Sequence, residues 1–332
     1  MISPVIFGLA GTELTADERD FFREADPVGF ILFQRNCDHP RQVMRLVASL
    51  RETIGRADAP VLIDQEGGRV ARLKPPHWRV YPSAATIAAL PAAREAAFLS
   101  ARLIADDLSQ LGITVDCAPV LDIPVPGADA IIGDRAWGIT PESVAQLGAA
   151  FCDGLMAGNV LPIIKHIPGH GRGTVDSHFS LPIVATRADE LAATDFAPFR
   201  ALAGMPWAMT AHIVYSAFDS DLPATLSKSV IEGVIRAGVG FDGVLVSDDL
   251  SMKALGDSLA ARARGALKAG CDLVLHCNGD QTEMSEIAGA IGPLDAMARR
   301  RVDAGEARRH APGAFDRDAA ERRFDALLQG AR

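Results

Sequence analysis

The stretch LPIIKHIPG, residues 161–169, shows the pattern on which the fold depends. It is a short and almost wholly apolar run that passes directly into a lysine, a histidine and a turn-forming Pro-Gly pair. A run that is apolar at successive positions is typical of a strand covered on both faces, as in a parallel sheet, whereas an antiparallel strand with one wet face alternates. We therefore expect a buried parallel strand that ends in charged side chains.

Seven further apolar runs of the same kind recur along the chain, at 4–11, 28–34, 60–67, 113–122, 207–215, 243–250 and 272–278. Helical patterns separate them. The clearest helix is 92–112, which is apolar along one stripe and ends at Gly112, a suitable C-cap. Other helices are expected near 40–54, 141–158, 188–203, 228–237 and 258–269.

Eight strands separated by helices predict a (β/α)8 barrel, a fold of ~250 residues or more, and the 332 residues are enough for one. A doubly wound open sheet is the alternative, but no G-x-G-x-x-G follows the first strand and no Walker A sequence is present. We expect one catalytic domain over residues 1–332. The arginine-rich tail, 296–332, is predicted to form one or two solvated helices packed on the barrel exterior.

Composition restricts the partners. The formal net charge of −9 is spread along the chain, which argues against a nucleic-acid partner, because such affinity comes largely from basic side chains. No apolar stretch reaches the ~18–20 residues of a spanning helix, so no membrane partner is expected. The five cysteines include no C-x-x-C pair, which indicates reduced thiols. We expect a cytoplasmic monomer or weak homodimer.

Polar residues gather where five consecutive strands end. The third run ends in Asp64 with Gln65, Glu66, Arg69 and Arg72 following; the fourth ends in Asp122, and its loop carries Asp134 and Arg135; the later ends carry Lys165, His166, His212, Asp248 and Asp249. Any single aspartate could be a helix cap or a turn residue. Together, at the same end of a barrel, they indicate one pocket. For His212 alone a structural, hydrogen-bonded role is favoured.

Asp248 and Asp249 end the seventh run, VLVSDDL. Side chains alternate along a strand, so one carboxylate can point into the barrel mouth while the other points sideways. The inward one would be a fixed, partly desolvated group suited to act as a nucleophile. The pattern by itself leaves both residues open.

Residues 169–178, GHGRGTVDSH, place His170, Asp176 and His178 among three glycines. One interpretation is a metal-dependent hydrolase, with zinc held by ligands drawn from His166, His170, His178, His212 and Asp248. Against it, the chain has no H-E-x-x-H and no H-x-H on the first strand, and a glycine-rich loop positions ligands poorly. We therefore expect no metal and no other cofactor.

Four motifs together resemble the signatures of glycoside hydrolase family 3, and more closely its bacterial β-N-acetylhexosaminidases of peptidoglycan recycling. They are I-D-Q-E-G-G-R-V-x-R (63–72), K-H-I-P-G-H-G (165–171), D-S-H (176–178) and S-D-D-L-S-M (247–252). The resemblance runs from about residue 5 to about residue 280, in the family's order and spacing. Small departures, Ile167, Trp137 and His276, remove no catalytic group.

The resemblance implies a single-domain (β/α)8 barrel and a retaining exo-β-N-acetylglucosaminidase. Its substrates would be β-1,4-linked muropeptide fragments that carry terminal N-acetylglucosamine, cleaved through a covalent glycosyl-aspartate. It assigns the nucleophile to Asp248 and the acid/base role to His178 with Asp176 as its partner. Residues matching those that hold the sugar are Asp64, Arg72, Arg135, Lys165 and His166.

A histidine acid/base is chemically reasonable, because an ordinary imidazole pKa of ~6.5 allows proton transfer in both directions near neutral pH. We expect Gly169, Gly171 and Gly173 to act as hinges that let the loop close over bound sugar. Two alternatives keep the same site. One is a phosphorylase, since histidine does not repel phosphate as a carboxylate does; the other is a sugar-binding protein without turnover.

Overall fold

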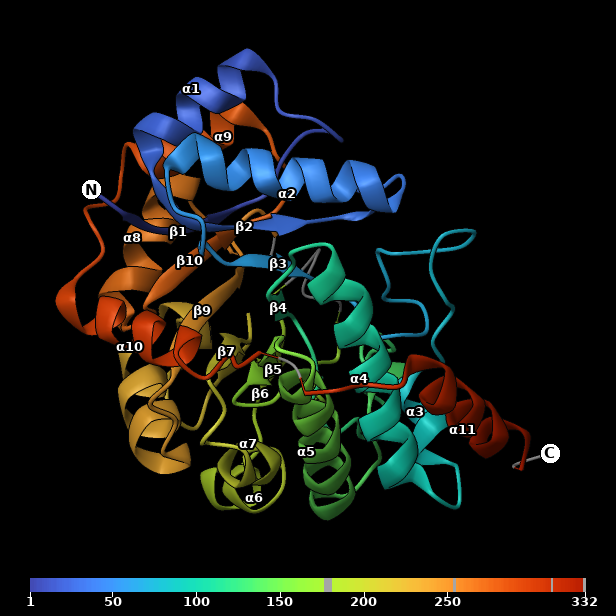
Figure 1. Ribbon diagram of the computed structural model, residues 1–332. Coiled ribbons are helices and arrows are strands. Elements are labelled where there is room, and N and C mark those ends of the chain that lie inside the picture. The colour runs from blue at the N-terminus through green and yellow to red at the C-terminus, as the bar shows by residue number, and fades with distance from the viewer. Residues whose placement is uncertain (176–180, 253–254, 312, 331–332) are drawn as a thin grey trace.

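Eight parallel strands close into a barrel in the computed structural model, which describes residues 1–175, 181–252, 255–311 and 313–330 (Figure 1). Each overlaps its predicted run, and their order around the barrel follows the chain. They are β1 (Ser3–Phe7), β2 (Pro27–Leu32), β3 (Val61–Ile63), β4 (Val115–Asp116), β5 (Leu161–Ile167), β7 (Trp207–Thr210), β9 (Val244–Asp249) and β10 (Leu273–His276), which pairs with β1. The predicted barrel is confirmed. A separate two-stranded sheet joins β6 (Ile183–Val184) to β8 (Val214–Tyr215).

Helices surround the strands (Figure 1). The longer ones are α1 (Ala16–Ala25), α2 (Pro40–Ile54), α4 (Ala93–Gln110), α5 (Pro141–Ala157), η4 (Ser229–Val239), α8 (Leu259–Ala269), α9 (Gln281–Ala288), α10 (Ala296–Glu306) and α11 (Arg317–Gln329). Shorter ones are α3 (Ala84–Ala88), α6 (Ala188–Ala193), α7 (Ala197–Ala201) and the 3₁₀ turns η1 (Gln34–Asn36), η2 (Gly133–Arg135) and η3 (Ala224–Leu226). The sequence prediction missed α1, α3 and α9.

The helix predicted over 188–203 is in fact two helices, α6 and α7, and this correction has a local cause. Pro198 lies in the first turn of α7 and has no backbone N–H to continue the ladder from α6. At the break, the Thr194 hydroxyl donates to the Glu190 carbonyl at 2.7 Å. The chain therefore turns after α6 and restarts at Ala197.

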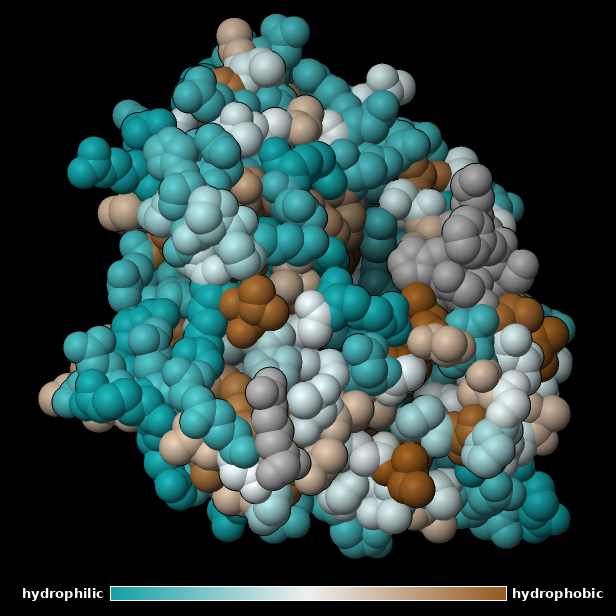
Figure 2. Space-filling view, turned by 90° about the vertical axis from the view of Figure 1, so that its right-hand side faces the viewer, coloured by the Kyte–Doolittle hydropathy of each residue, from teal (hydrophilic) through white to brown (hydrophobic). Residues whose placement is uncertain are grey.

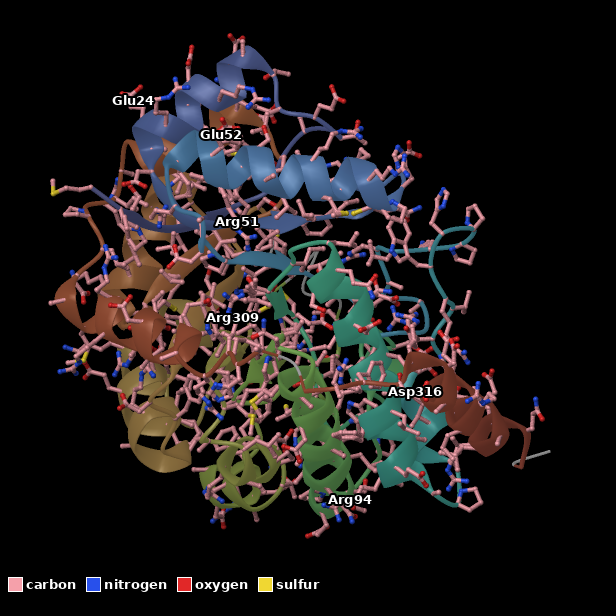
Figure 3. All side chains as sticks on the ribbon, viewed as in Figure 1. Glu24, Arg51, Glu52, Arg94, Arg309 and Asp316 are labelled. Atoms are coloured by element: carbon pink, nitrogen blue, oxygen red, sulfur yellow. The ribbon has the colours of Figure 1, made fainter. Side chains whose placement is uncertain are left out.

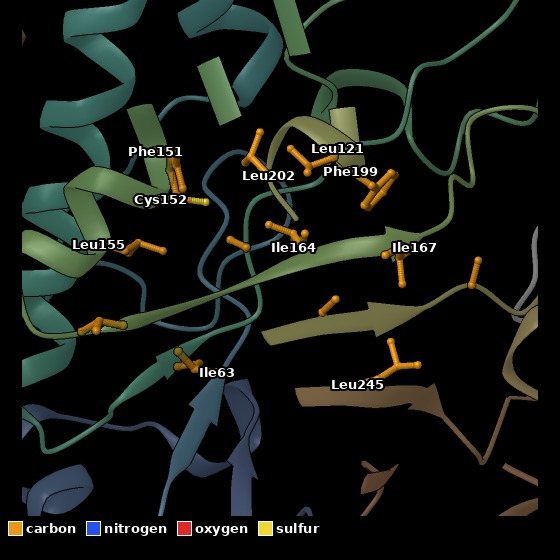
Figure 4. Close-up of a cluster of buried hydrophobic side chains, with 14 of the residues drawn as sticks. Ile63, Leu121, Phe151, Cys152, Leu155, Ile164, Ile167, Phe199, Leu202 and Leu245 are labelled. Carbon is orange, nitrogen blue, oxygen red and sulfur yellow. The ribbon is translucent and has the colours of Figure 1, made fainter. Parts of the chain in front are cut away.

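The core forms two layers because side chains alternate along each barrel strand. Outward-facing residues such as Ile63, Ile164 and Leu245 belong to one large buried cluster with Phe151 of α5 and Phe199 of α7, part of which is drawn in Figure 4. Inward-facing residues form a separate buried cluster inside the barrel: Ile6, Val28, Ile31, Leu62, Val115, Cys117, Leu161, Ile163, Trp207, Met209, Val244, Val246, Leu273, Leu275 and Cys277, joined by Val302. The interior is thus packed with side chains.

The same alternation positions the site. Two residues beyond the inward-facing Leu62, Ile163 and Val246, the strands present Asp64, Lys165 and Asp248. Each of these polar residues therefore continues the inward-facing series at the carboxyl end of its strand, where barrel enzymes carry their sites.

The C-terminal tail contributes two helices at different places. Val302 of α10 belongs to the interior cluster, and Arg301 pairs with Asp272 at 2.9 Å. Helix α11 packs on α4, where Arg323 pairs with Glu95 at 2.7 Å. In Figure 1 the connecting chain crosses the view from α10 to α11; Figure 3 labels Arg309 on it and Asp316, whose carboxylate caps α11.

The surface shown in Figure 2 is mixed: hydrophobic side chains lie in small separate groups among hydrophilic ones. This pattern is typical of ordinary solvent-facing surface. Among the residues that the structure describes, no helix combines the length and the apolar character needed to cross a bilayer.

Candidate active site

A pocket of about 270 Å³ opens at the carboxyl ends of the barrel strands. We call it the strand-end pocket. Six residues to which the resemblance assigns a role line it together: Asp64, Arg72, Arg135, Lys165, His166 and Asp248. Its apolar lining comes mainly from the uppermost inward-facing residues, among them Ile31, Met209, Leu275 and Cys277. Residues far apart in the chain therefore meet where the parallel strands end.

Five charged side chains form an open ring of ion pairs within this pocket, with an arginine at each of its two ends. The Lys165 Nζ lies 2.8 Å from Asp64 Oδ1 and 2.6 Å from Glu66 Oε1. On one side, Arg72 Nη2 donates to Asp64 Oδ2 at 2.9 Å. On the other side, Arg135 donates to both carboxylate oxygens of Glu66, from Nε to Oε2 at 2.9 Å and from Nη2 to Oε1 at 2.8 Å. We refer to these five residues as the ion-pair ring.

The ring keeps its members charged despite their burial. Burial acts to raise the pKa of Asp64 and Glu66, but the neighbouring cations outweigh it, and the pKa of Glu66 falls to about 2. Burial acts to lower the pKa of Lys165, but Asp64 and Glu66 raise it well above its ordinary range. A ring of fixed, charged donors and acceptors suits a hydroxylated ligand, because it offers directional hydrogen bonds in a desolvated site.

From the sequence, Glu66 was placed among the polar residues at the strand ends but was not assigned to the sugar site. It lies two positions after Asp64, the spacing that places side chains on the same side of extended backbone. Two carboxylates side by side need a cation between them, which is Lys165, and Arg135 pairs with Glu66 on its other side. Phe33 was missed by the sequence analysis: the guanidinium groups of Arg35 and Arg72 both lie over its ring, with Cζ atoms 5.0 and 4.9 Å from the ring centroid.

His166 is oriented by the buried carboxylate of Asp122. The His166 Nδ1 lies 2.7 Å from Asp122 Oδ2, and the backbone N–H of His170 donates to Asp122 Oδ1 at 2.6 Å. Burial acts to raise the pKa of Asp122, yet the His166 imidazole and the His170 N–H lower it. Burial lowers the pKa of His170 to about 4, and its ring lies edge-on to His166 with centroids 5.6 Å apart. Asp122 thus fixes which face His166 turns to the pocket.

The two carboxylates at the end of β9 have different surroundings. Asp249 accepts hydrogen bonds from the Ser251 hydroxyl at 2.6 Å and from the backbone N–H groups of Ser251 and Cys277 at 3.0 and 3.2 Å. Asp248 accepts one from the Asp249 N–H at 2.8 Å and lies beside His212 and His166. Burial acts to raise the pKa of Asp248, but these imidazoles and that N–H lower it.

His212 is a structural residue, as favoured from the sequence. It is buried, and its Nδ1 lies 2.7 Å from the Thr225 hydroxyl while its Nε2 donates to the Asp249 carbonyl at 3.0 Å. Because the carbonyl only accepts, Nε2 carries a proton. His212 therefore supports the backbone at the end of β9.

The stretch 169–173, which we call the β5 loop stem, is closely packed. A Cβ on Gly171 would lie 1.8 Å from the Ile123 carbonyl oxygen, and Gly169 has φ +144°. The stem is held by the Tyr215 hydroxyl on the Gly169 carbonyl at 2.6 Å. Gly169 and Gly171 allow close approach of neighbouring chain, and the hinge role expected from the sequence stays a prediction. Asp176 and His178 lie outside the described residues.

Across the described ranges, 1–175, 181–252, 255–311 and 313–330, no three His, Cys, Asp or Glu side chains are grouped so as to hold a metal ion. The site therefore combines a set of ion-paired side chains with the carboxylate of Asp248 at the end of β9.

A closed parallel barrel with a charged, ligand-sized pocket at its carboxyl ends defines this chain as a barrel enzyme for a small polar ligand. Comparison with known proteins specifies the family. The model of the glycosyl hydrolase family 3 N terminal domain matches residues 10–309. The chain belongs to this family and is a glycoside hydrolase.

Curated relatives and a solved structure match this chain over most of their own length. A curated β-hexosaminidase from Methylococcus capsulatus is 37% identical over 323 residues, 95% of this chain and 93% of the relative. One from Pseudomonas aeruginosa is 39% identical over 282 residues, covering 84% of this chain and 83% of the relative. The crystal structure of native NagZ from Neisseria gonorrhoeae matches with TM-score 0.85 and 32% identity, covering 98% of this chain and 96% of that one.

Proposed function

We propose that this chain is a retaining exo-β-N-acetylglucosaminidase that removes terminal N-acetylglucosamine from β-1,4-linked muropeptide fragments. The curated relatives named β-hexosaminidase support the reaction, as does a family 3 β-N-acetylglucosaminidase structure from Paenibacillus with TM-score 0.86, 32% identity and coverage of 98% of this chain and 67% of that one. The muropeptide substrate rests on the resemblance to enzymes of peptidoglycan recycling.

The observation that carries the proposal is the contrast between the two carboxylates of β9. Asp248 continues the inward-facing series Val244, Val246 and lines the strand-end pocket with a lowered pKa. Asp249 also borders the pocket, but its oxygens accept hydrogen bonds from Ser251 and Cys277. A nucleophile needs an ionised oxygen directed at the substrate, which favours Asp248.

In the proposed reaction an Asp248 oxygen forms a bond to the anomeric carbon while the bond from that carbon to the leaving oxygen breaks. His178, with Asp176 as its partner, donates a proton to the leaving oxygen. The same imidazole then takes a proton from water, which attacks the anomeric carbon and releases the sugar from Asp248. Two inversions at one carbon give net retention.

The ion-pair ring and His166 are proposed to hold the terminal sugar. Asp64 and Glu66 supply acceptors for hydroxyl groups, and Arg72, Arg135 and Lys165 supply donors whose positions the ring fixes in advance. Such preorganised groups lower the cost of orienting the ligand. For the whole protein we propose a cytoplasmic location and a monomer or weak homodimer, without nucleic-acid or membrane partners.

The test is mechanism-based trapping with an activated 2-fluoro glycoside, followed by peptide mapping. We expect the label on Asp248 and a burst of leaving group that matches the amount of enzyme. Label on Asp249 or elsewhere would refute the nucleophile assignment. Assays on N-acetylglucosaminides, glucosides and muropeptides, each with and without phosphate, test the substrate. Accumulation of a sugar 1-phosphate would show phosphorolysis instead of hydrolysis.

A matched pair of variants controls for folding. Asp248→Asn should lower kcat by at least about a thousandfold, because the nucleophile is lost. Asp249→Asn removes a hydrogen-bonded carboxylate from the same strand end but keeps the nucleophile, so it should retain far more activity. Equal losses in both variants, with intact fold, would contradict the distinct role of Asp248.

A further inference from the structure

The rim of the strand-end pocket carries an arginine for which the proposed mechanism has no use. Arg69 lies at a turn after β3, in which the Val70 N–H donates to the Gly67 carbonyl at 3.3 Å. Its side chain lines the pocket and is 44% exposed, whereas that of Lys165, in the ion-pair ring, is 3% exposed. Arg69 is therefore part of the rim rather than the floor.

The guanidinium of Arg69 reaches across to the chain that follows β4. Its Nε donates to Asp134 Oδ1 at 2.9 Å. Its Nη2 also donates to three successive backbone carbonyls, those of Ala130, Ile131 and Ile132. The distances to Ala130 and Ile132 are 3.2 and 3.5 Å. One side chain thus collects four acceptors from residues 130–134, which we call the β4 rim segment.

The β4 rim segment leads directly into the ion-pair ring. Ile131 and Ile132 line the pocket, and the next turn, η2, ends at Arg135. Arg135 Nη1 donates to the Ile131 carbonyl at 3.3 Å, while its Nε and Nη2 hold Glu66. The direction in which Arg135 points therefore depends on the backbone that Arg69 holds.

The chain after β4 is also bonded to the β5 loop stem. The Val125 N–H donates to the Gly171 carbonyl at 3.3 Å, and the Asp129 N–H donates to the Gly173 carbonyl at 2.8 Å. Asp129, just before the β4 rim segment, also accepts at Oδ1 from the Ile131 N–H at 2.8 Å. The loops after β3, β4 and β5 therefore form one continuous wall, and Arg69 makes the connection on the β3 side.

We propose that Arg69 is a positioning residue for sugar binding: it fastens the β4 rim segment so that Arg135 and the pocket wall meet the ligand in a fixed geometry. The inference rests on the proposed function, since the ligand in question is the terminal N-acetylglucosamine. An exposed ion pair with Asp134 alone would stabilise little. The planar fork of arginine serves a carboxylate and the carbonyls at once, which a lysine ammonium does not match.

The experiment compares wild type, Arg69→Ala and Arg69→Lys by two measurements. Hydrogen–deuterium exchange over residues 125–137 reports the rim segment, and steady-state kinetics on an aryl N-acetylglucosaminide report the ligand. We expect faster exchange in this region for both variants. We also expect KM to rise about tenfold with kcat within about threefold, as when binding common to ground and transition states is lost.

Arg323→Ala is the matched control, because Arg323 also forms an exposed pair between two elements, with Glu95 of α4, away from the pocket. It should change neither measurement. Unchanged exchange in Arg69→Ala, whether or not KM rises, would overturn the positioning role, as would faster exchange with an unchanged KM. If wild type cleaves no N-acetylglucosaminide, the proposed function fails. In that case calorimetric titration with N-acetylglucosamine replaces the kinetics, and unchanged affinity in Arg69→Ala overturns the positioning role.

Discussion

At the scale of single residues, strand alternation decides which polar groups face the pocket. Asp64, Lys165 and Asp248 each lie two positions past an inward-facing apolar residue, so their direction follows from the strands before them. By the same two-residue spacing, Phe33 follows the inward-facing Ile31 and Cys277 follows Leu275, and all four line the pocket. At the end of a strand, a polar residue at an inward-facing position is therefore a better candidate for the site than the residue next to it. This favours Asp248 over Asp249.

Asp116, the last residue of β4, is a buried carboxylate with a perturbed pKa beside the site. Its Oδ1 accepts from the Gln65 N–H at 2.9 Å, and no hydrogen-bond partner for Oδ2 is found among the described residues. Burial raises the pKa of Asp116 to about 8, above its ordinary value of 3.8. Between these two pH values the folded protein binds more protons at this site than the unfolded chain does.

Asp116→Asn should therefore change how stability depends on pH. Because the folded pKa is the raised one, this residue makes the free energy of unfolding fall as pH rises from about 4 to about 8, by at most about 1.4 kcal/mol per pH unit. The amide cannot ionise, so the variant should lack this decline. Urea unfolding at several pH values measures it. Parallel wild-type and variant curves over this range would contradict the assignment.

Much of the site was predictable because its residues follow apolar runs at fixed places. The sequence could not reveal which cation pairs with which carboxylate, because Lys165 meets Glu66 only through the closure of the barrel. Nor did it reveal Asp122 as the partner of His166, since an aspartate at a strand end is as often a cap. Pairings across strands depend on distances that spacing along the chain does not contain.

At the scale of elements, capping residues and helix-breaking prolines determine where the helices begin and end. Helix α1 was missed although Thr15 and Glu18 form a capping box, a signal that is readable as T-x-x-E. The break between α6 and α7 likewise has a visible cause in Pro198. The packing of the β5 loop stem was not readable, because glycines that permit bending and glycines that permit close contact look alike in sequence.

Gly171→Ala tests the packing role of the stem. The added methyl would meet the Ile123 carbonyl oxygen at 1.8 Å, so backbone must move, at a cost of about 1–3 kcal/mol. We expect lower stability in denaturant unfolding together with reduced kcat/KM, since this stem leads towards His178. Gly233→Ala is the control, because no atom beyond its chain neighbours and its own helical backbone lies within 4 Å of its added Cβ, and the helix favours alanine. A hinge role would instead predict unchanged stability with altered activity.

At the scale of the whole molecule, the tail and the pocket occupy separate parts of the barrel. The pocket is lined by residues between Ile31 and Cys277, all before the tail begins. Helix α10 contributes Val302 to the interior cluster beside Trp207, and α11 covers α4. In this fold the carboxyl ends of the strands generally carry the chemistry, and other surfaces contribute to stability. We therefore propose that the tail stabilises one catalytic domain without shaping the site.

Phe324→Ala tests this division. Phe324 of α11 is fully buried in the main core, and the Arg79 guanidinium lies over its ring at 5.2 Å. Truncation should lower the free energy of unfolding by about 3–5 kcal/mol, because a large cavity is left. KM and kcat at 25 °C should stay at wild-type values while the protein is folded. Arg323→Ala, on the exposed face of the same helix, should cost less than about 1 kcal/mol. A stability loss no greater than that control would show that α11 lies outside the core, and an altered KM in the folded variant would show that the tail does shape the pocket.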